Sequence, residues 1–133
     1  MDNFLDSIVV RVAHPYPPSM AHKYMEKPDE QAWARRSNQA TVAGAEAFGR
    51  LVSFAELSDT GQGRTASRFV AAVIGARPYD MHDLRAVDIA ISDDMLICLD
   101  ALRWKQVALT DLVPDGRARC IALCKAKGLI GEA

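Results

Sequence analysis

Hydrophobic positions recur at helical spacing through most of this 133-residue chain, and they are densest between residues 80 and 104. At about 100° per residue, most apolar side chains of this stretch fall on one broad arc: Met81, Leu84, Val87, Ile91, Met95, Cys98, Leu99 and Leu102. A weaker apolar strip runs along another side. Because a helix that is apolar on more than one side is surrounded by other helices, the pattern predicts a central helix over residues 80–104.

The region before this helix is also predicted to be helical. A helix start at Pro28, followed by acidic residues that suit the positive end of the helix dipole, leads into a helix that runs to about Leu57 with a break near residues 37–38. Gly44 and Gly49 lie in its interior, where glycine costs about 1 kcal/mol relative to alanine. We interpret both as sites where a neighbouring helix approaches closely.

The remaining helices are bounded by turn and cap signals. Residues 58–62 read as a turn in which Asp59 and Gln62 match a capping-box variant, and the helix after it ends at Gly75. A short helical turn is predicted over 107–113 and a last helix over 114–128. The fold class is therefore all-α, a small multi-helix bundle over residues 28–133.

Residues 1–27 differ from the rest and predict an extended N-terminal arm. Several prolines there prevent helix, and residues 7–13 are β-branched enough for one short strand. One interpretation is an arm that lies over the helices. The other is a strand that pairs with another chain, in a homodimer or with a partner, through contacts that include Tyr16 and Tyr24.

Composition narrows the class of protein. The net charge of −1 argues against a chain-wide attraction to nucleic acid or anionic membrane, and no apolar run approaches the roughly 18 residues of a membrane span. Cys98, Cys120 and Cys124 are predicted to be reduced core residues, as in a cytoplasmic protein. No metal-ligand spacing or catalytic motif is strong, and no cofactor is expected.

Arginines gather near the second helix and the start of the central one. We take them, with Tyr79, as candidates for binding a protein surface or an anion: Arg64, Arg68, Arg77 and Arg85. A solvated face with acidic neighbours is the plainer interpretation.

Asp88 falls inside the main apolar arc of the predicted central helix. An isolated buried carboxylate is expensive, so a structural ion pair with Arg68 or Arg50 is expected.

The adjacent His82-Asp83 pair matches the centre of HD-type metal phosphohydrolases, whose metal activates water. A first ligand would have to come from His14 or His22 and a last one from Asp111 or Asp115. Two-residue matches arise by chance, so a metal site at His82 and Asp83 is kept as an alternative only.

Residues 44–113 resemble a family of small uncharacterised proteins and domains from proteobacterial plasmids, phages and integrated elements. The resemblance rests on GAEAFGRLVSFAELSDTGQGRTASRFVAAVIGA and the following RPYDMHDLRAVD. It implies the context of an accessory protein of mobile DNA, and the family carries no established activity or catalytic residue to transfer. We therefore expect a non-enzymatic protein that binds a host protein, for example an anti-defence inhibitor of anti-CRISPR type. The alternatives are an HD-like metal-dependent phosphohydrolase and a nucleic-acid-binding accessory protein that uses the arginine patch.

Overall fold

The computed structural model describes residues 24, 27, 29–104 and 106–131 of the chain. The chain divides into two units, Met1–Glu30 and Gln31–Ala133. The predicted strand at residues 7–13 and Tyr16 lie outside the described residues. All elements described below belong to the helical unit, apart from the first residue of its longest helix.

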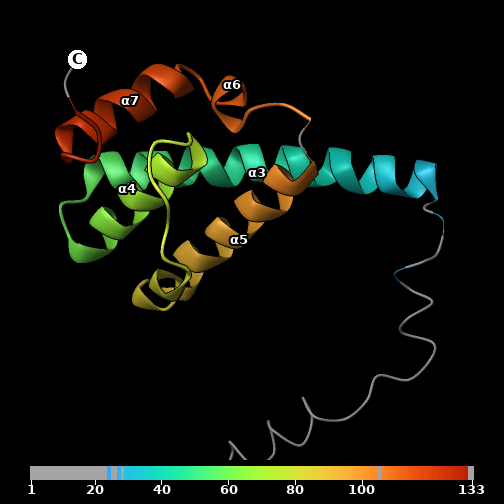
Figure 1. The fold of residues 1–133 in the computed structure, drawn as a ribbon, viewed down its shortest axis with the longest axis horizontal. Coiled ribbons are helices and arrows are strands. Elements are labelled where there is room, and N and C mark those ends of the chain that lie inside the picture. Colours follow the sequence, from blue (N-terminus) through green and yellow to red (C-terminus); the bar gives the residue numbers. More distant parts are fainter. Residues whose placement is uncertain (1–23, 25–26, 28, 105, 132–133) are drawn as a thin grey trace, which may run out of the picture. The chain divides into compact units, whose positions relative to one another are not determined.

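The longest helix, α3 (Glu30–Leu57), is the axis on which the bundle is built (Figure 1). Its buried positions follow the i, i+3, i+4 pattern of one helix face: Ser37, Ala40, Thr41, Gly44, Ala47, Phe48, Leu51, Val52 and Ala55. The predicted break near residues 37–38 is wrong. The buried face of the helix runs through Ser37 and Thr41 without interruption, and the Thr41 hydroxyl is satisfied within the helix by donating to the Ser37 carbonyl at 2.7 Å.

Helix α4 (Gly61–Val73) begins at a cap that differs from the predicted one. Thr60 is the N-cap, and its side-chain oxygen accepts from the Gly63 amide at 3.2 Å. The predicted pairing of Asp59 with Gln62 is wrong, because Gln62 instead accepts a hydrogen bond from the distant Asp88 amide at 2.8 Å. The predicted end is confirmed, since Gly75 adopts a positive φ of 78° just beyond the helix.

The prediction of one helix over residues 80–104 is wrong in its first third. Met81–Ala86 forms a 3-10 helix, η1, and Val87 is extended (φ −127°, ψ 161°), so α5 spans only Ile89–Trp104. The Asp80 side chain caps η1 by accepting from the His82 amide at 2.9 Å. The break rotates the earlier residues out of the phase of α5, and Met81 is consequently exposed.

The prediction that this segment is the enclosed centre of the bundle is also wrong. Only Met95, Cys98 and Ala101 of α5 are buried, whereas the buried face of α3 extends over most of that helix. Figure 1 shows α5 along one side of α3, with α6 (Leu109–Leu112) and α7 (Gly116–Ala126) along the other.

The last two helices confirm the predicted short turn and terminal helix. Gly128, with φ of 70°, lies just past α7, as the glycine signal predicted. Arg119 of α7 binds Glu56 of α3, and Lys127 binds Asp59 in the turn before α4. These ion pairs tie the end of the chain to α3 and its following turn.

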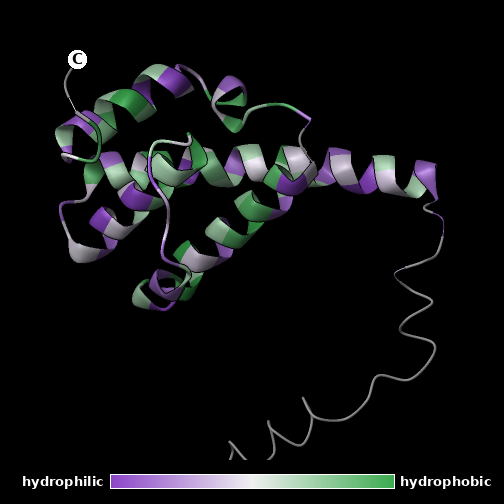
Figure 2. Cartoon of the chain, in the orientation of Figure 1, coloured by the Kyte–Doolittle hydropathy of each residue, from purple (hydrophilic) through white to green (hydrophobic). Residues whose placement is uncertain are grey.

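The core joins the inner faces of the described α-helices, and the all-α fold class is confirmed. Figure 2 shows hydrophobic residues concentrated along α5 and the part of α3 beside it. Cys98, Cys120 and Cys124 are free and buried, as predicted, and burial raises the pKa of Cys98 to about 12 and that of Cys120 to about 11. Among the described residues, no helix is long and apolar enough to cross a membrane.

Candidate functional site

An apolar pocket of about 230 Å³ opens between α4, η1 and α5, and we call it the Tyr79 pocket. Its lining consists almost entirely of carbon side chains: Phe69, Ala72, Val73, Tyr79, Met81, Leu84, Leu99 and Leu102. Pockets of this kind favour apolar groups of a ligand or of a partner side chain.

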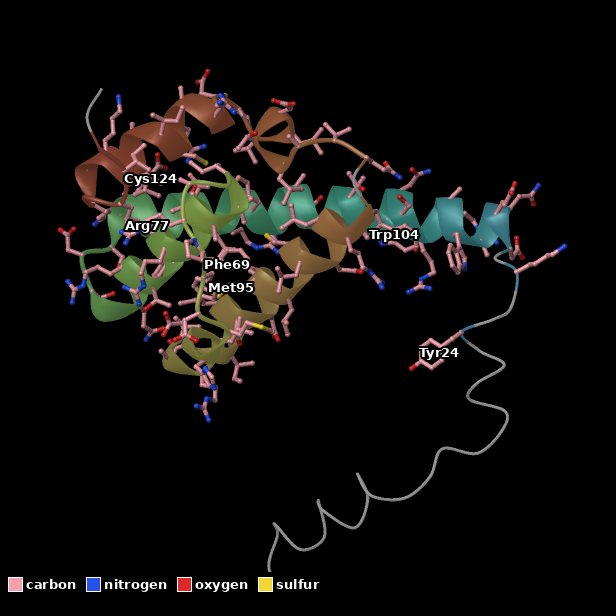
Figure 3. The ribbon with its side chains drawn as sticks, viewed as in Figure 1. Tyr24, Phe69, Arg77, Met95, Trp104 and Cys124 are labelled. Carbon is pink, nitrogen blue, oxygen red and sulfur yellow. The ribbon has the colours of Figure 1, made fainter. Side chains whose placement is uncertain are left out.

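Tyr79 forms one wall of this pocket and contacts both flanking helices. Its ring packs edge-to-face on Phe69 of α4, with centroids 5.3 Å apart and planes at 88°, and its hydroxyl lies 3.6 Å from the Met95 sulfur of α5. Figure 3 shows Phe69 and Met95 close together between these helices. Burial, with a smaller contribution from the Asp83 carboxylate, raises the pKa of Tyr79 to about 12. The hydroxyl is therefore a neutral, structural group.

An exposed apolar strip on α5 continues from the rim of the pocket. Ile89, Leu96 and Leu99 share one side of the helix, because positions i, i+7 and i+10 differ by less than a quarter turn. Their exposed fractions are 76%, 52% and 42%, and that of Met81 at the pocket rim is 75%. Leu96 and Leu99 are one helical turn apart and Leu99 lines the pocket, whereas Ser92 and the exposed Asp93 separate Ile89 from Leu96. Neighbouring exposed apolar residues mark interaction sites more often than isolated ones do.

Two of the predicted arginines are engaged within the fold. Arg64 donates to the backbone carbonyl of Asp59 at 3.0 Å. Arg68 donates to Thr65 Oγ1 at 3.0 Å and lies 3.5 Å from an Asp83 carboxylate oxygen. The Asp83 carboxylate thus partly neutralises the charge of Arg68, whereas Arg64 is bonded to a backbone carbonyl and keeps its charge.

The other predicted binding residues are dispersed. Arg77 follows the end of α4 and Arg85 lies in η1, both exposed. Tyr79 lies in the apolar pocket and does not extend the arginine surface. Tyr24 belongs to the N-terminal unit.

His82 and Asp83 do not point to a common ligand. The His82 Nδ1 lies 3.0 Å from Asp80, whereas Asp83 faces Arg68. Three or more metal-ligating side chains converge nowhere within the described part of the chain. His14 and His22, the suggested first ligands, lie outside that part, so the metal hypothesis gains no support from geometry.

The predicted ion pair at Asp88 is wrong, although both of its candidate partners bind carboxylates. Asp88 is exposed, and its amide donates to Gln62. Arg50 instead binds Asp94 with two hydrogen bonds of 2.8 and 3.0 Å. The reason is the break at Val87, which places Asp88 outside α5 and leaves Asp94 facing α3.

A second surface feature is a pair of tryptophans at the far end of α5. Trp33 and Trp104 meet edge-to-face with centroids 6.2 Å apart, and the guanidinium groups of Arg36 and Arg103 lie 5.6 and 5.1 Å from the Trp104 ring. The Trp104 Nε1 is buried without a hydrogen-bond partner in the described structure. The four side chains pack on each other, which favours a stabilising role.

Sequence reasoning missed the pocket because it assigned Met81, Leu84 and Leu99 to a buried helix face. One signal in the sequence could have indicated the pocket. Residues 80–104 carry more apolar side chains than one neighbouring helix can cover, so some of them had to stay exposed. No curated protein and no solved structure matches the chain. A family model described as a family of unknown function, DUF7673, matches residues 45–128, so the chain belongs to this family.

Proposed function

We propose that this chain is a non-enzymatic protein that works by binding another protein, with the Tyr79 pocket and the exposed strip of α5 as its docking site. The observation that carries the proposal is the continuity of pocket and strip, where Met81, Leu96 and Leu99 expose apolar side chains beside an apolar cavity. Burial of such side chains contributes about 1.5–3 kcal/mol each, enough for a few of them to sustain a specific contact.

The proposed mode is a helix laid into a groove. A partner segment inserts one apolar side chain into the Tyr79 pocket and covers the strip of α5 with its neighbours. The ring of Tyr79 is fixed between Phe69 and Met95, so this wall of the pocket is formed before binding. Inhibition of the partner would then be steric, through occupation of its surface.

The biological setting is part of the same proposal. The resemblance to proteins of plasmids, phages and integrated elements favours a cytoplasmic accessory protein of mobile DNA that acts on a host protein. An anti-defence inhibitor of anti-CRISPR type is the concrete form of this idea.

The test combines affinity purification from a proteobacterial host with binding measurements on each purified partner. Met81→Asp and Leu96→Asp place a charge on the docking site, and we expect each to weaken a genuine partner at least tenfold. Leu57→Asp is the matched control, because Leu57 is almost fully exposed at the end of α3 and outside the pocket. If every partner bound all three variants with the same affinity as the unaltered chain, the proposed docking site would be refuted.

A further inference from the structure

We infer that the segment which occupies this docking site is a basic amphipathic helix, with an apolar stripe flanked by lysine or arginine. This inference rests on the proposed function and adds the chemistry of the partner. It is carried by the charges around the apolar surface.

The segment that forms most of the site is strongly acidic. Residues 80–104 contain six aspartates and two arginines. Asp80 and Asp83 are sequence neighbours of the pocket residues Tyr79, Met81 and Leu84. Burial is the main cause of the raised pKa of Tyr79, and the nearby Asp83 and Asp80 carboxylates raise it further, as expected for acidic groups close to the pocket.

Part of this acidic charge is neutralised within the fold. Asp83 faces Arg68 at 3.5 Å, Asp94 binds Arg50, and Asp100 binds Arg103 at 2.6 Å.

The rest of the acidic charge remains available. Asp88 and Asp93 are exposed, and neither carboxylate forms an ion pair with any described residue. The Asp80 carboxylate has His82 as its partner among the described residues, and the His82 ring is charged only when protonated. Arg85 is the single exposed cation of the segment that stands without such a pair in the described structure. Within residues 80–104 the charge without an ion pair is therefore mainly acidic, and Arg77, exposed two residues before Tyr79, is a cation outside this segment.

The acidic charge beside the docking site favours some kinds of binding partner over others. A second copy of the chain would bring the same unpaired aspartates against their counterparts, and like charges across an interface cost affinity. Nucleic acid and anionic lipid are disfavoured for the same reason. A segment with cations beside its apolar residues would complement both features.

The strip also sets the length of the occupant. From Ile89 to Leu99 a helix rises roughly 15 Å at about 1.5 Å per residue, which is close to three turns. A partner helix of about the same length, with apolar residues at i, i+4 and i+7, would cover it.

The test uses three labelled peptides of equal length and the full chain. One is an amphipathic Lys/Leu helix, the second has glutamate in place of each lysine, and the third is a scrambled Lys/Leu sequence without an apolar stripe. In fluorescence anisotropy we expect the first peptide to bind at least tenfold more tightly than either control. Its affinity should fall at least threefold between low and high salt.

Two variants connect binding to the docking site. Met81→Asp should weaken the basic peptide several-fold, despite adding an acidic group, because it interrupts the apolar surface. Asp80→Asn combined with Asp93→Asn should leave the apolar surface intact and remove most of the salt dependence. Glu46→Asn, on the exposed side of α3, is the control for loss of an acidic side chain elsewhere.

The results that would contradict the inference can be separated from those that would contradict the proposed function. If the acidic or the scrambled peptide bound as tightly as the basic amphipathic peptide, the inferred occupant would be refuted. It would also be refuted if analytical ultracentrifugation showed the chain to self-associate and Met81→Asp abolished this self-association. Binding of none of the peptides would also refute it. If a natural partner still depended on Met81 and Leu96, the proposed function would stand without the inference; without such a partner, both would fail.

Discussion

Gly44 of α3 and Ala101 of α5 lie so close that a Cβ atom at position 44 would overlap the Cβ of Ala101. The carbonyl of Gly44 also accepts a weak hydrogen bond from the Cys98 thiol at 3.8 Å. This contact sets the distance between the two helices and therefore the position of the face of α5 that carries the exposed strip. Close approach at Gly44 was predicted from the sequence and is confirmed.

Gly44→Ala is expected to destabilise the protein by about 1–3 kcal/mol, because the added methyl group must push α5 away from α3. Gly49→Ala is the matched control in the same helix. Its Cβ would make only an ordinary contact, 3.9 Å from Val113, and alanine is the better helix former by about 0.8–1 kcal/mol. Urea denaturation of both variants measures the difference, and equal stabilities would contradict the close contact.

Asp94→Asn is expected to cost roughly 0.5–1 kcal/mol, since it removes one charge from a two-bond ion pair with the half-exposed Arg50. Asp88→Asn, six residues earlier, should change the free energy of unfolding by less than about 0.5 kcal/mol because Asp88 is exposed. Thermal or chemical denaturation measures the free energy of unfolding of the two variants. If Asp88→Asn lowered the free energy of unfolding more than Asp94→Asn did, the ion pair predicted at Asp88 from the sequence would be supported instead.

The contrast between Asp88 and Asp94 shows how far the sequence determines the structure. Turn and cap signals were sufficient to locate α4 and α7, and apolar spacing located α3 apart from the break wrongly predicted near residues 37–38. The break at Val87 had no such signal: neither proline nor glycine marks it, and the hydrogen bond that holds the Asp88 amide comes from Gln62, 26 residues away. A 3-10 helix also preserves i, i+3 spacing, so Met81 and Leu84 still looked like part of α5.

The candidate site was harder to predict for the same reason. Sequence reasoning singled out Arg64, Arg68, Arg77 and Arg85, because cations are easily recognised as binding groups. The apolar residues of the Tyr79 pocket resemble core residues until the neighbouring helices are placed. Only the structure reveals that Leu99 and Met81 remain uncovered.

Glu56→Gln is expected to reduce stability by roughly 0.5–1 kcal/mol at neutral pH and to flatten the acid side of the stability profile. Arg119 binds Glu56 at 2.5 and 3.2 Å, and these hydrogen bonds lower the pKa of Glu56 below its usual 4.5. A carboxylate whose pKa is lowered by folding stabilises the protein above its unfolded pKa, and this contribution is lost as the pH falls through the lower, folded value.

Denaturation of both proteins between pH 7 and pH 3 measures this effect. The two curves should approach each other toward the acid end, as Glu56 of the unaltered protein becomes protonated. Glu46→Gln is the control, because Glu46 is exposed on the same helix and forms no ion pair with the described residues. A constant difference between the Glu56→Gln variant and the unaltered protein at every pH would contradict the role of this ion pair.

The last prediction concerns the ionisation of Tyr79. Burial between α4 and α5 raises its pKa to about 12 from an ordinary value of 10.0. The folded protein therefore holds this proton more tightly than the unfolded chain does, and stability is lost as the pH rises from about 10 toward 12. In an ultraviolet titration of the folded protein, we expect a late phenolate step that Tyr79→Phe removes.

The same titration tests occupation of the docking site. A peptide that fills the Tyr79 pocket should exclude more water from the ring and move the late step to still higher pH, because desolvation disfavours the phenolate. Tyr79→Phe should leave the peptide's affinity nearly unchanged, since the hydroxyl points to the Met95 sulfur and not to a charged partner. A late step that does not move when the peptide is bound would place the peptide elsewhere on the surface.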